Sequence, residues 1–566
     1  MKPIRTRHTL DRMARDPDEG GAFVFDLVDD EVADLEAPLA LSGADGEGDP
    51  DGAEPAPGAT LSGALGRRLR VLAPVAAVLA VVVGTGFAVD GARDGARMER
   101  MRDVRGGVAD VTAPLRETWE WDGRVGPSGS AGEGRWNEVA VLGDLLAFQS
   151  GEDLVALDPA TGDEAWRLRL GEDSECGPQG SVGWSEAVTQ QLVCLADAGP
   201  DRVAVVVGPE GATSAERTLG AADARYGAAR PGPDGTVLRA ERVGPEPPPG
   251  ANKGECTSPG NCTGMVEVGR GVRLRAEDAV TGEERWSVTV PFSPTRADQC
   301  TNWYATYWDG ARNVVDLDDM IDDDGFGARI TDDVVQLYGC GVESAITGNG
   351  VLLGAESEPG TRSVASLRAG GYLMHEFDGA IRSTLYDADG GLVGEIDGYA
   401  LEPTAVDGSG PETLLASGAS GPWVRSYTLD GTPRWDVAAP GEMQLFLAQV
   451  GGAAIFQTGA GQVRALDLAT GTERWTWDPA EPDSAHLNDL YVTRAFTDGQ
   501  SVLLVVETSS GGRGLVALDA VTGEVAWEQR GPDRSSIDNA PRPSSGLVAV
   551  DGNLLEVAPD GVRGLG

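Results

Sequence analysis

Four aspartates stand in the same surroundings and are the first residues to consider for catalysis. They are Asp158, Asp278, Asp467 and Asp519. Each lies in an eleven-residue frame, Ala-x-Asp-x-x-Thr-Gly-x-x-x-Trp, whose first copy runs from Ala156 to Trp166. Carboxylates serve enzymes as general acids, general bases or nucleophiles. Because a catalytic group rarely needs copying into every repeat, we interpret the four aspartates as structural.

The six cysteines are a second set with chemical potential, either for disulfides or for metal binding. They are Cys176, Cys194, Cys256, Cys262, Cys300 and Cys340. The sequence contains no Cys-x-x-Cys and only three histidines, His8, His375 and His486, which argues against a zinc site. Sequence proximity favours pairing Cys176 with Cys194, Cys256 with Cys262 and Cys300 with Cys340, although six cysteines allow 15 pairings. Disulfides indicate an oxidising, extracytoplasmic compartment.

Several function classes lack the residues that they need. Lys2 and Lys253 are the only lysines, so no phosphate-binding loop ending in Gly-Lys-Ser or Gly-Lys-Thr is present. The nucleophile motif Gly-x-Ser-x-Gly is missing as well, and Gly348-Asn349-Gly350 is only a weak phosphate-binding pattern. A formal net charge of −45 and a pI near 4.3 repel phosphate backbones, which argues against nucleic acid as a partner.

Two polar stretches are further candidates for ligand binding. The loop 316–325 is rich in aspartate, but aligning Gly325 with the glycine of an EF-hand puts Met320 and Thr331 at the first and last ligand positions. That register fails, so we expect a solvated acidic insertion, with irregular calcium binding left open. The aromatic cluster 303–308, WYATYW, either presents rings to a ligand or fills a core between sheets.

The repeated frame is best explained as a β-hairpin. Aspartate and threonine side chains satisfy turn amides, and glycine supplies the positive φ that a branched residue resists. Tryptophan is large enough to fill the wedge between adjacent sheets. We therefore predict that the following residues hold neighbouring sheets together: Trp166, Trp286, Trp435, Trp475, Trp527, Gly162, Gly282, Gly471 and Gly523.

Residues 117–566 read as short alternating strands separated by turns, with almost no helical periodicity. Weaker copies bring the number of hairpins to eight, and Trp435 and Trp475 lie 40 residues apart, which fits one propeller blade. We predict an all-β fold, a β-propeller of eight blades, with seven as the alternative. The segment 117–125 resembles an outer strand without its hairpin, so the chain start should complete the last blade.

The residues before the propeller have a different character. Residues 1–66 are acidic and rich in glycine and proline, which predicts a disordered tail. Residues 71–89 carry no charge over 19 positions, which predicts a transmembrane signal-anchor helix within 67–90. In 91–116 arginines alternate with acidic and small residues, which is typical of a juxtamembrane stalk.

The orientation of this anchor depends on the cysteines. Arginines flank the apolar stretch on both sides, so the positive-inside rule does not decide. Because every cysteine follows the anchor, we predict a cytoplasmic N-terminus and an extracytoplasmic propeller in the plasma membrane. The stretch Phe23 to Asp30, FVFDLVDD, could bind a cytoplasmic partner, or could be a few stray hydrophobic residues in a tail.

The repeated frame resembles the tryptophan-docking repeat of the pyrroloquinoline-quinone-like (PQQ-like) β-propellers, which it matches in full four times. The preference for arginine over lysine, with much alanine, glycine and aspartate, is typical of a GC-rich genome and suggests an actinobacterial member. The family includes quinone-dependent alcohol and glucose dehydrogenases. It also includes non-catalytic relatives such as the outer-membrane assembly lipoprotein, which use the propeller as a binding platform.

The resemblance implies a function once the active-site residues of the enzyme branch are compared with this sequence. The enzyme branch carries adjacent cysteines over the quinone, an aspartate base and calcium ligands, whereas no two cysteines here are adjacent. The Cys-x-x-Cys-His motif of haem-bearing relatives is also missing. We expect a non-catalytic protein-binding, scaffold or envelope-sensing module with no cofactor and no metal ion. The alternative is a dehydrogenase that uses PQQ and calcium.

Overall fold

The computed structural model describes residues 95–566 with gaps. The gaps are 128–137, 172–173, 182–186, 199–200, 212–215, 221–228, 253–254, 259–260, 298–314, 317–325, 332, 355–361, 379, 419–422, 439–442, 480–489, 509–512 and 531–544. All described residues belong to the second of two compact units, 81–566, and the first is 1–80. The predicted tail and the predicted anchor at 71–89 lie outside the described residues. Within the described part, no helix is long and apolar enough to cross a membrane.

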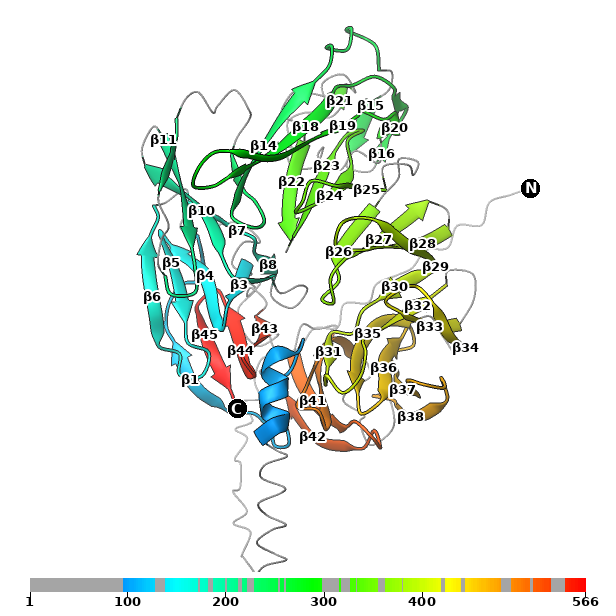
Figure 1. The fold of residues 1–566 in the computed structure, drawn as a ribbon. Helices are drawn as coiled ribbons and strands as arrows, with labels where there is room; N and C mark the ends of the chain where they lie inside the picture. Colours follow the sequence, from blue (N-terminus) through cyan, green and yellow to red (C-terminus); the bar gives the residue numbers. More distant parts are fainter. Residues whose placement is uncertain are drawn as a thin grey trace, which may run out of the picture. The chain divides into compact units, whose positions relative to one another are not determined.

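The described residues form nine blades, each a meander of four antiparallel strands (Figure 1). Blade 1 contains β3 (Glu138–Leu142), β4 (Leu145–Gly151), β5 (Asp153–Leu157) and β6 (Glu164–Arg169). Blade 2 contains β7 (Glu175–Gly177), β10 (Leu192–Ala198), β11 (Asp201–Val207) and β12 (Arg217–Leu219). Blade 3 contains β13 (Arg230–Pro231), β14 (Thr236–Val243), β18 (Gly271–Asp278) and β19 (Glu284–Val290).

The next three blades follow in chain order. Blade 4 contains β22 (Phe326–Thr331), β23 (Val334–Gly339), β24 (Ser344–Thr347) and β25 (Leu352–Leu353). Blade 5 contains β26 (Arg362–Ser366), β27 (Tyr372–Asp378), β28 (Ala380–Tyr386) and β29 (Leu392–Asp397). Blade 6 contains β30 (Tyr399–Leu401), β32 (Thr413–Ser417), β33 (Trp423–Thr428) and β34 (Pro433–Ala438).

The last three blades bring the chain back to its start. Blade 7 contains β35 (Met443–Val450), β36 (Ala453–Thr458), β37 (Val463–Asp467) and β38 (Glu473–Trp477). Blade 8 contains β39 (Leu490–Thr497), β40 (Ser501–Thr508), β41 (Arg513–Asp519) and β42 (Val525–Arg530). Blade 9 contains β43 (Gly546–Val550), β44 (Asn553–Ala558), β45 (Gly561–Leu565) and β1 (Glu117–Trp121).

Short strands lie beside or between the blades. The sheet of blade 1 also takes in β2 (Gly126–Pro127), β8 (Gly180–Ser181) and β9 (Ala187–Thr189), and that of blade 7 takes in β31 (Ala405–Val406). Two small sheets are inserted around blade 3. One contains β15 (Glu255–Ser258), β16 (Asn261–Cys262) and β21 (Val315–Asp316), and the other contains β17 (Met265–Val266) and β20 (Thr295–Arg296).

The all-β propeller is confirmed, but the predicted count of eight blades is wrong. The additional blade is blade 4, which has a weak sequence signal because its outer strand has only two residues, Leu352 and Leu353. Its last turn, where Gly350 donates a backbone hydrogen bond of 2.9 Å to Thr347, lacks the aspartate and is followed by no tryptophan. The glycine pattern at 348–350 is this turn, not a phosphate-binding loop.

The ring closes where the sequence predicts. Strand β1 pairs with β45 in antiparallel register, so the start of the propeller supplies the outer strand of blade 9. Arg116 and Gly566 exchange two backbone hydrogen bonds of 2.9 Å at the end of this pairing. The closing blade therefore depends on both ends of the propeller chain.

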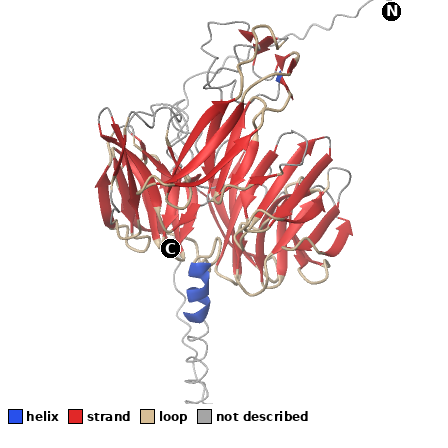
Figure 2. Ribbon diagram, turned by 45° about the horizontal axis from the view of Figure 1, so that its top comes forward, coloured by secondary structure: helices blue, strands red, loops and turns tan. Residues whose placement is uncertain are grey.

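The core is divided among the seams between neighbouring blades. Each of the nine seams contains a cluster of buried apolar side chains contributed by both of its blades. The helix formed by residues 95–103 projects from the ring of strands (Figure 2). Stacked sheets bury each other's faces, which explains why a blade needs neighbours on both sides.

Candidate functional site

The two ends of the blades carry different parts of the chain. Because neighbouring strands run in opposite directions, the connection from first to second strand and that from third to fourth lie at the same end. Residues 95–116, which we call the linker, contact this end, which we call the linker face. At the other end, the insertion face, the chain leaves blade 3 for β15 to β17 and later for β20 and β21 (Figure 1).

Tryptophans of the repeated frame dock on the turn of the following blade rather than on their own turn. The indole Nε1 of Trp475 donates a hydrogen bond of 3.1 Å to the carbonyl of Ala520, and the ring lies on Gly523. Gly523 has a φ of +73°, and a Cβ there would lie 2.5 Å from the ring. The same arrangement joins Trp119 to Gly162, Trp166 to Gly211, Trp286 to Gly350 and Trp435 to Gly471.

An arginine takes the place of tryptophan in the seam between blades 2 and 3. Arg217 lies against Gly282, and its Nε donates a hydrogen bond of 3.1 Å to the carbonyl of Ala279. Ala279 follows the turn aspartate just as Ala520 does in blade 8. The Nη1 and Nη2 atoms of Arg217 both bind Oε2 of Glu277 at 3.1 Å. Sequence reasoning missed Arg217, although its place at the start of an outer strand was a usable signal.

The repeated aspartates hold their own turns. Oδ1 of Asp467 accepts hydrogen bonds from the amides of Ala469 and Thr470, at 3.1 and 2.9 Å, and its Oδ2 binds Arg474 at 2.8 Å. The hydrogen bond from Arg474 is the main cause that lowers the pKa of Asp467 to about 2. In Asp278 the amide of Thr281 is the main cause, and the pKa is again about 2. These carboxylates stay ionised as turn acceptors, which fits the structural interpretation.

The linker is packed against the blades from Met101 onward, although the sequence suggests a stalk. Met101 is fully buried, and Arg105 binds Oε2 of Glu402 at 3.0 Å. Burial raises the pKa of Glu402, and the charge of Arg105 opposes this rise. Backbone hydrogen bonds continue the contact. They join Val406 to Arg105, Thr497 to Gly106, Val108 to Thr497 and Ala109 to Gly552, at 2.8 to 3.0 Å.

The linker also supplies a missing docking turn. Trp527 of blade 8 meets no hairpin turn on blade 9, because the third and fourth strands of that blade are the two ends of the propeller chain. Its Nε1 instead donates a hydrogen bond of 2.9 Å to the carbonyl of Val111, and Gln529 donates one of 3.0 Å to Leu115. Val111 and Leu115 are buried with Trp527 in one cluster. The linker is therefore part of the seam between blades 8 and 9.

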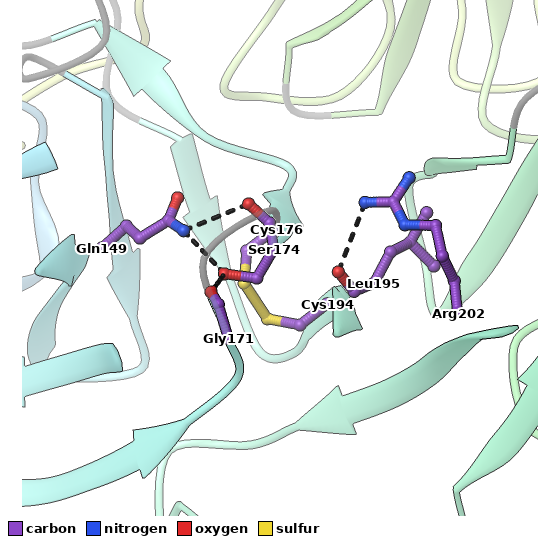
Figure 3. Close-up of a disulfide and its surroundings, with 7 residues drawn as sticks. All are labelled: Gln149, Gly171, Ser174, Cys176, Cys194, Leu195 and Arg202. Carbon is purple, nitrogen blue, oxygen red and sulfur yellow. Dashed lines mark hydrogen bonds between the residues drawn. A yellow bond between two sulfur atoms is a disulfide. The ribbon is translucent and has the colours of Figure 1, made fainter. Parts of the chain in front are cut away.

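The described residues include at least one cysteine of each predicted disulfide pair. Cys176 of β7 and Cys194 of β10 form a disulfide with a Cα separation of 4.0 Å (Figure 3). Its surroundings are fixed by Gln149, whose Nε2 binds the carbonyl and hydroxyl oxygens of Ser174. Cys340 is also disulfide-bonded. In the third pair, the strand register places the Cα atoms of Cys256 and Cys262 opposite each other.

The described residues offer no metal-binding set. No group of three histidine, cysteine, aspartate or glutamate residues in the described part could hold a metal ion. His375 is buried in the seam between blades 5 and 6, where its Nδ1 lies 2.9 Å from the hydroxyl of Ser383. The aromatic cluster 303–308, His486, the stretch from Phe23 to Asp30 and nearly all of loop 316–325 lie outside the described residues.

A family model and several solved structures are similar to parts of the chain. A family model described as outer membrane protein assembly factor BamB matches residues 384–493, from blade 5 to the start of blade 8. BamB from Moraxella catarrhalis shares 15% identity, with 80% of this chain and 99% of that chain covered and a TM-score of 0.34. A europium-containing methanol dehydrogenase shares 12% identity, with 78% and 84% covered and a TM-score of 0.33.

A third solved structure is dihydro-heme d1 dehydrogenase NirN in complex with DHE. It shares 12% identity, with 75% of this chain and 79% of that chain covered and a TM-score of 0.29. No curated protein sequence matches the chain. The chain therefore carries PQQ-like repeats in a β-propeller, and the similar proteins include both an assembly factor and dehydrogenases.

Proposed function

We propose that this protein is a non-catalytic binding platform, which a membrane anchor holds in one orientation with the insertion face turned toward a protein partner. The observation that carries the proposal is the docked linker. The linker follows the predicted anchor in the sequence, and the Arg105–Glu402 pair and the backbone hydrogen bonds at 105–109 hold it on the linker face. A propeller held in this way keeps its linker face toward the membrane.

The arginines that follow the predicted anchor support this orientation. Arg105 is bound to Glu402, and the charge of Arg102 acts on the carboxyl of Asp551, partly offsetting the burial that raises the pKa of Asp551. Arg97 lies beside Gly499 and lowers the pKa of Asp110 as the smallest of several causes, after hydrogen bonds from Thr112. Arginines used for docking need not mark the cytoplasmic side, which would explain why the positive-inside rule is undecided.

The insertion face offers apolar side chains to a partner. Phe377 at the end of β27 is 42% exposed and Tyr491 at the start of β39 is 47% exposed. Met265 and Val268 of the blade 3 insertion are exposed as well. Exposed aromatic and methionine side chains are enriched in protein interfaces. The family model that matches residues 384–493 is described as an assembly factor, which favours a binding role over catalysis.

Site-specific photo-crosslinking in native membranes tests the proposal. A photoreactive phenylalanine analogue replaces Phe377 or Tyr491 on the insertion face, and Leu392 or Val521 on the linker face as controls. The controls are each 65% exposed, so poor access cannot explain a negative result there. We expect both insertion-face positions to give the same adduct, identified by mass spectrometry, and the controls to give none of it.

Two outcomes would contradict the proposal. Equal crosslinking from both faces would mean that the linker does not orient the propeller. No adduct from either face, together with calcium-dependent binding of PQQ and reduction of a redox dye, would favour the quinone-dependent dehydrogenase instead.

A further inference from the structure

The face of blade 3 that packs on blade 2 changes its character along the strands. The face of blade 3 that packs on blade 2 carries Val237 in the apolar cluster of this seam. Because side chains alternate along a strand, Arg239 and Glu241 lie on the same face of β14 as Val237. This face therefore changes from apolar at Val237 to charged at Arg239 and Glu241.

A buried carboxylate organises the charged region. Glu277 has only 2% of its side chain exposed and binds Arg217 at 3.1 Å. It also binds Arg275 and lies 3.8 Å from Nε of Arg239, whose side chain is 3% exposed. Three guanidinium groups thus converge on one carboxylate at the base of the seam. Buried charges of this kind persist only when they are paired.

A small cavity opens above this cluster, on the charged face of blade 3. It measures about 100 Å³ and is lined by Arg239, Glu241, Arg273, Arg275, Glu284 and Ser287. Arg273 bridges the cavity wall through a 2.9 Å ion pair with Glu241, and its side chain is 49% exposed. We propose that this cavity binds a small oxyanion, a carboxylate or a phosphate group, with Arg273 as its accessible contact.

The charged side chains around the cavity favour an anion, although the protein as a whole has a negative net charge. The charged side chains that meet here are four arginines and three glutamates: Arg217, Arg239, Arg273, Arg275, Glu241, Glu277 and Glu284. Guanidinium groups bind carboxylate and phosphate oxygens through paired hydrogen bonds. Charges elsewhere on the surface are screened beyond roughly 8 Å at physiological ionic strength. The proposal goes beyond the binding platform and does not depend on it.

Titration calorimetry on the full-length protein in detergent tests this inference. Inorganic phosphate and acetate serve as separate probes at constant ionic strength, which distinguishes the two sources of an oxyanion. We expect one of them to bind, and Arg273→Gln to weaken its binding about tenfold, as loss of a charge-assisted hydrogen bond does. Arg285→Gln is the matched control, because Arg285 is 44% exposed, has a 2.7 Å ion pair with Asp278 and lies outside the cavity.

A third variant sharpens the result. Glu241→Gln releases Arg273 from its ion pair and should tighten oxyanion binding. Absence of binding by the unaltered protein would overturn the proposal, as would equal effects of Arg273→Gln and Arg285→Gln. Weaker binding by Glu241→Gln would also overturn it, because Glu241 would then be part of a different kind of site.

Discussion

Two seams of the ring solve the same packing problem with different chemistry. In the seam between blades 7 and 8, Trp475 lies on Gly523 within a cluster of 18 buried apolar residues. In the seam between blades 2 and 3, Arg217 lies against Gly282, and the cluster has seven buried apolar residues. Both side chains donate one hydrogen bond to the residue after the turn aspartate.

The difference shows which part of the docking contact is general. The hydrogen bond to the turn carbonyl and the close approach to glycine occur in both seams, so they set the spacing of the blades. The large apolar side chain of tryptophan can be replaced, but only where another interaction takes the place of its apolar contacts. Arg217 needs the buried carboxylate of Glu277. A buried ion pair offsets the free-energy cost of removing its charges from water only when both groups have their hydrogen-bond partners. The tryptophan seam is stabilised by buried apolar surface, and the arginine seam is stabilised by attraction between opposite charges.

Truncating the tryptophan should have the largest effect on stability. Trp475→Ala removes a side chain that is 7% exposed and leaves a cavity between two sheets. We expect a loss of about 3–5 kcal/mol in unfolding free energy, as for other buried aromatic residues. Urea unfolding followed by tryptophan fluorescence measures it. Tyr491→Ala, at a position 47% exposed, is the control, and a difference below about 1 kcal/mol between the two would refute the role of the seam.

Acid should weaken a third kind of seam, which has neither tryptophan nor arginine at its docking turn. Between blades 5 and 6, burial lowers the pKa of His375 to about 4 from an ordinary 6.5. The unfolded chain then binds the proton more readily, so stability is complete above pH 6.5 and falls as the pH drops to 4. The loss amounts to about 3 kcal/mol at most.

Urea unfolding of the unaltered protein and of His375→Phe across this pH range measures the effect. The phenylalanine variant cannot be protonated, and Ser383 keeps its hydrogen bonds to Gly398 and Ala400. We expect a flatter pH dependence in the variant. Identical slopes would show that His375 is not the group responsible.

Much of the fold follows from local sequence, because the hairpin is a local structure. The frame predicts positive φ at the turn glycines, and Gly162, Gly282, Gly471 and Gly523 have φ between +73° and +77°. Closure by residues 117–121 follows from an unpaired outer strand. Each signal is local in the sequence, turn chemistry in the frame and strand alternation in 117–121, although the closing strand pairs with residues at the other end of the propeller chain.

The rest depends on contacts that sequence spacing cannot show. Trp166 packs on Gly211 of the next blade, and Trp527 packs on Val111. Each of these contacts joins two elements that are separate in the sequence. Blade 4 was hidden by a short outer strand without tryptophan. The oxyanion cavity combines residues of three strands, and only their register brings Glu241 opposite Arg273. The tail and the membrane anchor stay predictions, since they lie outside the described residues.

Salt should affect the stability of the arginine seam and of the tryptophan seam differently. Arg217→Ala removes one of the guanidinium groups bound to Glu277, while Arg239 and Arg275 remain, so we expect a loss of about 1–3 kcal/mol. Because part of this loss is electrostatic, it should shrink in 1 M NaCl compared with 0.1 M NaCl. The loss from Trp475→Ala should not shrink. Equal salt dependence of the two variants, measured by urea unfolding, would mean that charge does not hold the arginine seam.

The smallest expected difference comes from the two docking glycines. Gly523 and Gly282 have nearly the same φ, +73° and +77°, so replacement by alanine costs each of them about 1–2 kcal/mol of backbone strain. At Gly523 the added methyl meets the indole of Trp475 at 2.5 Å, which is rigid and buried. At Gly282 it meets Nη1 of Arg217 at 2.6 Å, the end of a flexible chain. Gly523→Ala should therefore cost about 1 kcal/mol more than Gly282→Ala in the same unfolding measurement, as overpacking does. The reverse order would mean that Arg217 is held more rigidly by Glu277 than Trp475 is by its apolar neighbours.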